Sequence, residues 1–305
     1  MSPMAQATLS TGSPVYAIDF IDPKHFVYAG GGGAGRTGVP NVIKATEIQL
    51  PDGIPSLHSC GEIMLNSNED APMCLSVNPS KTLQSHLVCG INAPADEMKQ
   101  GKNPHVRVFE FSVHEHPAAR AEAQMGQASS SISLSPITAI PSLGITDPEH
   151  YQKTAQFSPD GKLFTVASTD GRLQLHRYPS MAPVFSSSIG VISLNEEIYD
   201  TDFSHDGRQL AVTTLSRIVI FSTTPQTIEG ETPTFAPRIL QVIEKPVVGS
   251  GTGATFRMGN ESTWPLLGRW LVRHVCHVAS CSHVASAPEN EPCSWLPTYM
   301  HGILT

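Results

Sequence analysis

The stretch Phe157-Ser-Pro-Asp-Gly-Lys162 returns 46 residues later as Phe203-Ser-His-Asp-Gly-Arg208. Each copy leads into an alternating apolar run, Leu163–Ser168 in the first case and Gln209–Thr213 in the second. An Asp-Gly pair between alternating apolar segments is a strong signal for a β-hairpin. A unit of about four short strands that repeats at this period is typical of one blade of a β-propeller.

Weaker copies of the unit occur earlier, over Tyr16–Ala29 and Met73–Phe111. The interval before the next copy is too long for a plain blade, and the extra length from Ser112 to Asp147 is rich in Ala, Gln and Ser. We expect a mobile surface insertion over about 115–131. A fifth unit begins at Ala254 and then stops. The sequence therefore predicts an all-β fold, a WD-repeat β-propeller of about four to five blades over residues 14–257.

Composition excludes several classes of function. The chain of 305 residues has a formal net charge of −8 and no basic stripe, which argues against a nucleic-acid partner. The N-terminus lacks the features of a signal peptide, and no run of 18 apolar residues occurs. The nearest candidate span, Trp264–Val284, is interrupted by arginines and histidines. We expect a soluble chain without a transmembrane segment.

The cysteines do not suggest a disulfide framework. Cys60, Cys74 and Cys89 are scattered through apolar segments, which predicts buried free thiols in a reducing compartment. Three further cysteines and several histidines lie in the tail, but their spacing matches none of the usual zinc patterns.

A glycine-rich loop, Gly30-Gly-Gly-Gly-Ala-Gly-Arg-Thr-Gly-Val-Pro-Asn41, separates two strand-like segments. Such a loop can present backbone groups to an ion, a phosphate or a protein partner. It nearly matches the phosphate-binding loop and also fits the dinucleotide fingerprint G-x-G-x-x-G. Both motifs need a helix directly after the loop, whereas Pro40 and the strand-like Val42–Leu50 predict a strand. Neither nucleotide motif is expected to function here.

These features together resemble a known family, the endoplasmic-reticulum guanine-nucleotide exchange factors of the COPII coat pathway, also called the prolactin regulatory element-binding protein family. The resemblance depends on the glycine loop that ends in Gly38-Val39-Pro40-Asn41. It is supported by Asp70-Ala-Pro72, Leu87-Val-Cys-Gly90 and Thr255-Phe-Arg257. It covers roughly residues 14–257.

The resemblance implies a seven-bladed propeller on the cytosolic face of the endoplasmic reticulum, anchored in the family by a transmembrane segment after the propeller. It implies a regulator without covalent chemistry, which promotes GDP release from the small Arf-like GTPase that starts COPII vesicle budding. Asn41 is the implied catalytic residue. The implied GTPase contacts are Thr37, Gly38, Val39, Pro40 and Asp70. The implied metal is a potassium ion held by the backbone of Gly30, Gly31, Gly32, Gly33, Ala34 and Gly35.

Alternatives remain at each of these positions. Asn41 is also a common turn residue after a proline, and Asp70 is equally well a solvated loop acid. For the whole chain, the alternative is a non-catalytic WD-repeat scaffold. An enzyme with its own active site is disfavoured, because the repeats contain no nucleophile–base pair, and His150, His176 and His205 lie at strand or turn positions.

The stretch 258–305 departs from the family. It shows no strand alternation and no Asp-Gly hairpin, and it repeats His-Val-Ala-Ser within a few residues. We expect a divergent, non-native or disordered tail on a C-terminally truncated or mis-spliced product. An incomplete propeller would have open faces and unpaired strand edges, so we expect lower activity than in a complete relative.

Overall fold

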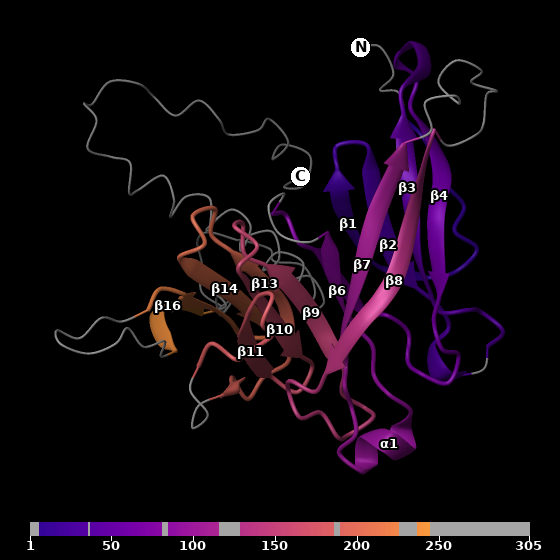
Figure 1. Ribbon diagram of the computed structural model, residues 1–305. Coiled ribbons are helices and arrows are strands. Elements are labelled where there is room, and N and C mark those ends of the chain that lie inside the picture. Colours follow the sequence, from indigo (N-terminus) through magenta and orange to yellow (C-terminus); the bar gives the residue numbers. More distant parts are fainter. Residues whose placement is uncertain are drawn as a thin grey trace, which may run out of the picture.

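The computed structural model describes residues 6–35, 37–80, 85–115, 129–185, 190–225 and 237–244. They form four antiparallel sheets of four strands each, in which neighbouring strands follow one another along the chain (Figure 1). This confirms the prediction of an all-β fold built from propeller blades.

The elements are as follows. The first blade consists of β1 (Val15–Asp22), β2 (His25–Gly30), β3 (Val42–Gln49) and β4 (Ser56–Met64), and the second of β5 (Cys74–Val77), β6 (His86–Gly90), β7 (Val106–Glu115) and β8 (Ser130–Ile140). The third consists of β9 (Gln152–Phe157), β10 (Leu163–Ser168), β11 (Arg172–Arg177) and β12 (Ile192–Ser193), and the fourth of β13 (Ile198–Phe203), β14 (Gln209–Thr214), β15 (Arg217–Ser222) and β16 (Arg238–Glu244). Helical turns are η1 (Gly33–Gly35), η2 (Pro51–Gly53) and α1 (Ala95–Lys99).

The repeated Asp-Gly motif forms the same turn in blades three and four. Asp160 Oδ1 accepts hydrogen bonds from Ser158 Oγ at 2.7 Å and from the Lys162 amide at 3.0 Å. Asp206 accepts the equivalent pair at 2.6 and 3.0 Å. Gly161 has a φ of +69°, a left-handed conformation that favours glycine. The two hairpins predicted from the repeat are therefore confirmed in structural detail.

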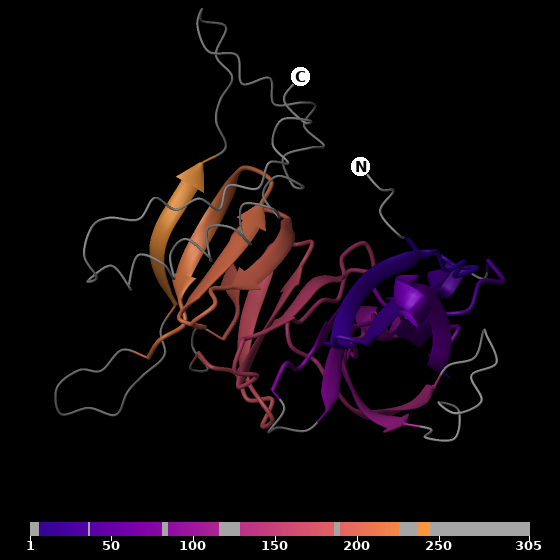
Figure 2. The same ribbon diagram turned by 90° about the horizontal axis from the view of Figure 1, so that it is seen from above.

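Successive blades pack face to face through apolar cores. One core lies between blades one and two around Ile43 and Leu87, the next contains Val88 and Phe164, and the third contains Leu175 and Val212. The first strands of neighbouring blades are in contact, β1 with β5, β5 with β9 and β9 with β13. The described sheets therefore follow one another in chain order, from the first blade at the right of Figure 2 to the fourth at its left.

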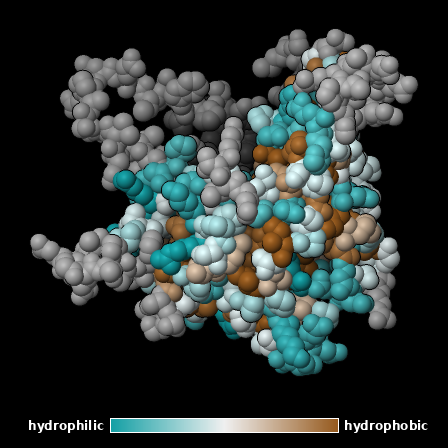
Figure 3. Space-filling model, viewed as in Figure 1, coloured by the Kyte–Doolittle hydropathy of each residue, from teal (hydrophilic) through white to brown (hydrophobic). Residues whose placement is uncertain are grey.

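Blades one and two also meet at their outer strands. A Cβ on Gly61 of β4 would overlap the carbonyl oxygen of Ile132 on β8, so only glycine allows this approach. Apolar side chains of β4 and β8, among them Ile63 and Ile137, line a pocket between these two strands. Figure 3 shows hydrophobic surface over the region of β7 and β8. The end of β4 lies beside the glycine loop, because Met64 pairs with Val42 and the Leu65 amide donates to the Asn41 carbonyl.

Strand continues on both sides of the predicted insertion over about 115–131, most of which lies outside the described residues. Residues up to Glu115 continue β7, and Ser130–Ile140 form β8, with Glu115 paired to Ser130. The alternation Ser131-Ile132-Ser133-Leu134 was hidden by the serine-rich composition. Residues 116–128, the unit expected from Ala254, the tail 258–305 and the tail cysteines lie outside the described residues. Within the described part, no helix is long and apolar enough to cross a bilayer.

Candidate functional site

The glycine loop (Gly30–Asn41) connects β2 to β3 in the first blade. Gly30 pairs with Val42 at its neck, and the Gly31 amide donates to the Pro14 carbonyl at 3.2 Å. The loop contains the short 3-10 turn η1 and runs directly into the strand β3. No helix follows that could face a phosphate with its N-terminus, so the expectation that neither nucleotide motif functions here is consistent with the structure.

Two glycines of the loop are required by the geometry. A Cβ on Gly32 would overlap Thr37 Oγ1, because the two arms of the loop approach each other there. Gly33 has a φ of +67° and lies against Asp70, whose Oδ1 is 2.9 Å from the position of a Cβ. The loop is therefore a folded unit, packed on itself and on the segment that precedes the second blade.

Asn41 is the centre of this packing. Its side chain is 1% exposed. Oδ1 accepts a hydrogen bond from the Gly33 amide at 2.9 Å. Nδ2 donates to the carbonyl oxygens of Asn66, Glu69 and Asp70 at 3.1 to 3.3 Å. The amide thus connects the glycine loop to the 66–70 loop (Asn66–Asp70) and is not presented at the tip of its own loop.

The exposed tip of the glycine loop consists of other residues. Solvent reaches Ala34, Gly35, Thr37, Gly38 and Pro40, whereas Val39 is half-buried. Thr37 Oγ1 accepts a hydrogen bond from the Val39 amide at 3.4 Å, which closes a small turn before Pro40. Of the residues predicted to contact a GTPase, Thr37, Gly38 and Pro40 are the accessible ones.

Asp70 lies beside the glycine loop, as the prediction of a shared site requires. Its amide donates to the Asn92 carbonyl at 3.0 Å, and its Oδ1 accepts from the Ala71 amide at 2.8 Å. Its neighbour Glu69 accepts a hydrogen bond from Arg107 Nη2 at 2.6 Å. Sequence reasoning missed Glu69 and Arg107, because no local pattern connects residues on different blades.

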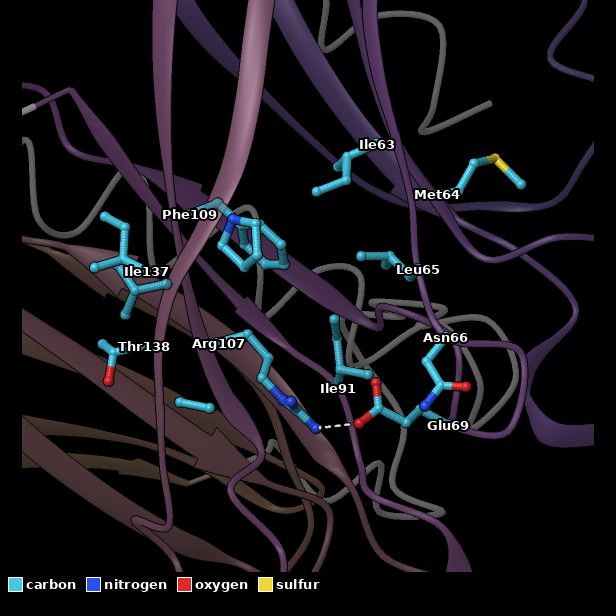
Figure 4. Close-up of a pocket in the computed structure, with 13 residues that line it drawn as sticks. Ile63, Met64, Leu65, Asn66, Glu69, Ile91, Arg107, Phe109, Ile137 and Thr138 are labelled. Carbon is cyan, nitrogen blue, oxygen red and sulfur yellow. Dashed lines mark hydrogen bonds and ion pairs between the residues drawn. The ribbon is translucent and has the colours of Figure 1, made fainter.

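A cavity of about 450 Å³ opens beside the 66–70 loop at the seam between blades one and two. Ile63, Leu65, Phe109 and Ile137 contribute apolar walls, and the Arg107–Glu69 ion pair lies at one end (Figure 4). The pocket therefore adjoins the candidate site through Glu69.

The inner side of the glycine loop is lined with neutral oxygens. Thr37 Oγ1 and Val39 O lie beside the position that a Cβ on Gly32 would take, and Pro40 O and Asn41 Oδ1 lie beside the position that a Cβ on Gly31 would take. Hydroxyl, amide and carbonyl oxygens are the ligands that potassium takes in proteins. A side chain on either glycine would overlap the oxygens beside it. The loop therefore contains oxygens of the kind that would hold the implied ion.

His105 and Cys74 are titratable side chains that are buried in the second blade. His105 Nε2 accepts from the Leu143 amide at 3.0 Å, so its Nδ1 carries the proton and donates to Gln152 Oε1 at 2.7 Å. Burial lowers the pKa of His105 to about 4 and raises that of Cys74 to about 12. Cys60, Cys74 and Cys89 are free and buried, as predicted. Among the described residues, no cluster of three or more His, Cys, Asp or Glu could hold a metal.

Comparison with known proteins identifies relatives of the chain. It is 28% identical over 216 residues to SED4 of Candida glabrata, covering 69% of the chain and 18% of that protein. It is 26% identical over 217 residues to the guanine nucleotide-exchange factor SEC12 of the same yeast, covering 70% and 41%, and 23% identical over 228 residues to SEC12 of Mus musculus, covering 65% and 48%. The chain thus spans less than half the length of each. No family model matches it.

Among solved structures, a periplasmic gluconolactonase of Pseudomonas aeruginosa aligns with a TM-score of 0.49 and 16% identity over 82% of this chain and 61% of its own. The propeller domain of Cps50 (Swd1) from Myceliophteria thermophila aligns with a TM-score of 0.46 and 11% identity over 76% and 58%. Both TM-scores are below 0.5, and the fold is established by the four antiparallel sheets themselves. In sequence, the chain is similar to the SEC12 and SED4 proteins, which confirms the resemblance that the glycine loop indicated.

Proposed function

We propose that the chain is a guanine-nucleotide exchange factor that promotes GDP release from the small Arf-like GTPase of the COPII pathway. The observation that carries the proposal is the glycine loop, with an exposed tip at Thr37–Pro40 and a base fixed by the buried amide of Asn41. The two relatives named as exchange factors align with most of this chain and support the same activity.

The proposed mechanism needs no covalent chemistry. An exchange factor binds the nucleotide-free GTPase more tightly than the GDP-bound form, so it shifts the population toward release. A loop performs this best when its conformation is set before binding, because ordering it during association costs affinity. In this chain the buried Asn41 fixes the base of the loop, while Thr37 and Pro40 at the exposed tip would contact the GTPase. We therefore propose that Asn41 acts by holding the loop in shape.

Potassium completes the proposed site. The oxygens of Thr37, Val39, Pro40 and Asn41, together with the backbone of Gly30–Gly35, are the groups that would hold the ion. When bound, the ion would add positive charge and cross-link the two arms of the loop. We also propose that the chain acts at the cytosolic face of the endoplasmic reticulum, where its partner GTPase would be recruited.

The test follows release of a fluorescent GDP analogue from the COPII GTPase, in potassium buffer and then in sodium or lithium buffer. The variant is Pro40→Glu, which places a charge on the exposed tip. The matched control is Pro51→Glu, an exposed proline at the opposite end of β3 in the same blade. We expect the control to match the unmodified chain and the tip variant to lose acceleration.

Acceleration that requires potassium and an intact tip would support the proposal in both parts. Acceleration that is the same in sodium would refute the role of potassium but keep the exchange activity. A folded chain that binds the GTPase without accelerating release would favour the alternative function, a WD-repeat scaffold.

A further inference from the structure

Arg107 is anchored in the second blade yet supports the glycine loop of the first. Its backbone lies within the central strand β7, paired with Cys89 on β6 and Ala139 on β8. Its guanidinium donates from Nη2 to Glu69 Oε1 at 2.6 Å, and the two side chains are only 19% and 17% exposed. Figure 4 shows this pair at the end of the pocket. Arg107 on strand β7 therefore holds Glu69 of the 66–70 loop through an ion pair.

The backbone of Glu69 connects this ion pair to Asn41 and so to the glycine loop. Its carbonyl oxygen accepts the hydrogen bond from Asn41 Nδ2 at 3.1 Å, and Asn41 Oδ1 accepts from the Gly33 amide at 2.9 Å. The path from Arg107 to η1 thus consists of one ion pair and two hydrogen bonds. The ion pair spans 38 residues and the Asn41–Glu69 bond 28, whereas the Asn41–Gly33 bond lies within the glycine loop.

The 66–70 loop is held by backbone and side-chain contacts and not by strand pairing. It belongs to no strand, and the Asp70 amide bonds the Asn92 carbonyl at 3.0 Å at its far end. The Arg107–Glu69 ion pair fixes the same end of the loop, next to Asp70, and just before the loop the Leu65 amide donates to the Asn41 carbonyl at 2.8 Å. Together these contacts hold the carbonyls of the loop in one arrangement. Asn41 requires that arrangement, because its single amide group contacts three carbonyls of this loop.

We propose that Arg107 is a positioning residue for the glycine loop, acting through Glu69 and Asn41 and not through contact with the GTPase. The inference rests on the proposed exchange function for its activity readout, but its effect on the loop can be measured without any partner. Loss of such a residue should slow GDP release, and part of that loss should appear as weaker binding of the GTPase, because a loosened loop must be ordered during association.

The experiment compares Arg107→Glu, Glu69→Arg and the double charge swap, with Arg107→Lys as a conservative variant. The first readout is amide hydrogen exchange of peptides that cover residues 31–41. We expect about tenfold faster exchange in each single variant, the size of a moderate pairwise coupling, and a return toward the original rate in the double variant and in Arg107→Lys. Peptides of blades three and four should not change.

The second readout is nucleotide release. We expect kcat/KM to fall about tenfold in the single variants, a higher potassium concentration for half-activation, and recovery of both in the charge swap. The matched control is Lys153→Glu, which breaks a comparable ion pair with Glu197 (Nζ–Oε1, 2.7 Å) at the interface of blades three and four. It should leave both readouts unchanged.

Failure of the inference and failure of the proposed function are distinguishable. Unchanged hydrogen exchange over 31–41 in the single variants would overturn the positioning role, whatever the activity. A charge swap that restores the loop but not release would show that Arg107 contacts the partner directly and would overturn the indirect path. A chain that never accelerates release would refute the exchange function, while hydrogen exchange would still decide the role of Arg107.

Discussion

The substitution Asn41→Ala should destabilise the fold through hydrogen bonds alone. It removes the acceptor of the Gly33 amide and the donor to the carbonyls of the 66–70 loop. Nδ2 has two hydrogens and three carbonyl neighbours, so it contributes about two full hydrogen bonds, and Oδ1 contributes about one. At roughly 1 kcal/mol for each bond, the free energy of unfolding should fall by about 3 kcal/mol.

The assay is equilibrium unfolding in urea, followed by fluorescence. With a slope of about 2 to 3 kcal/mol per molar urea, the midpoint should fall by about 1 to 1.5 M. Asn68→Ala is the control, since Asn68 is an exposed asparagine in the same 66–70 loop and should leave the midpoint unchanged. A midpoint for Asn41→Ala that matches the control would refute the conclusion that this amide holds the two loops together.

Other properties can be measured on the same protein. Because the pKa of His105 lies at about 4 in the fold against 6.5 in the unfolded chain, the unfolded state gains a proton first as the pH falls. The contribution of His105 to the free energy of unfolding should therefore decline by about 3 kcal/mol between pH 6.5 and 4. Unfolding curves of the His105→Gln variant should not show this loss. Gly61→Ala places a methyl group on the Ile132 carbonyl oxygen and should cost about 2 kcal/mol in thermal unfolding, whereas Gly35→Ala meets only ordinary contacts. Burial raises the pKa of Cys89 well above its usual value, so its thiol should react with a disulfide reagent only after unfolding, as mass spectrometry of tryptic peptides would detect.

The candidate site was predicted only in part. The glycine loop was singled out from its sequence and Asp70 from the family resemblance, and the structure places the two together. The burial of Asn41 was missed, because its partners lie 25 to 29 residues away in a loop without a motif of its own. Arg107 was missed for the same reason, since its ion pair with Glu69 spans 38 residues between two blades. Strand β8 was missed because its serines lowered the apparent hydrophobic alternation.

The features that the sequence alone determined are local ones. The Asp-Gly pairs at 160–161 and 206–207 specify hairpins, because the aspartate side chain and the left-handed glycine act within a few residues. The identity of the glycine loop is local as well. Tertiary structure decided which side chain holds that loop and which stay exposed. Asn41 and Arg107 gain their roles only when blade packing brings distant carbonyls and carboxylates within hydrogen-bonding distance, a contact that local sequence does not encode.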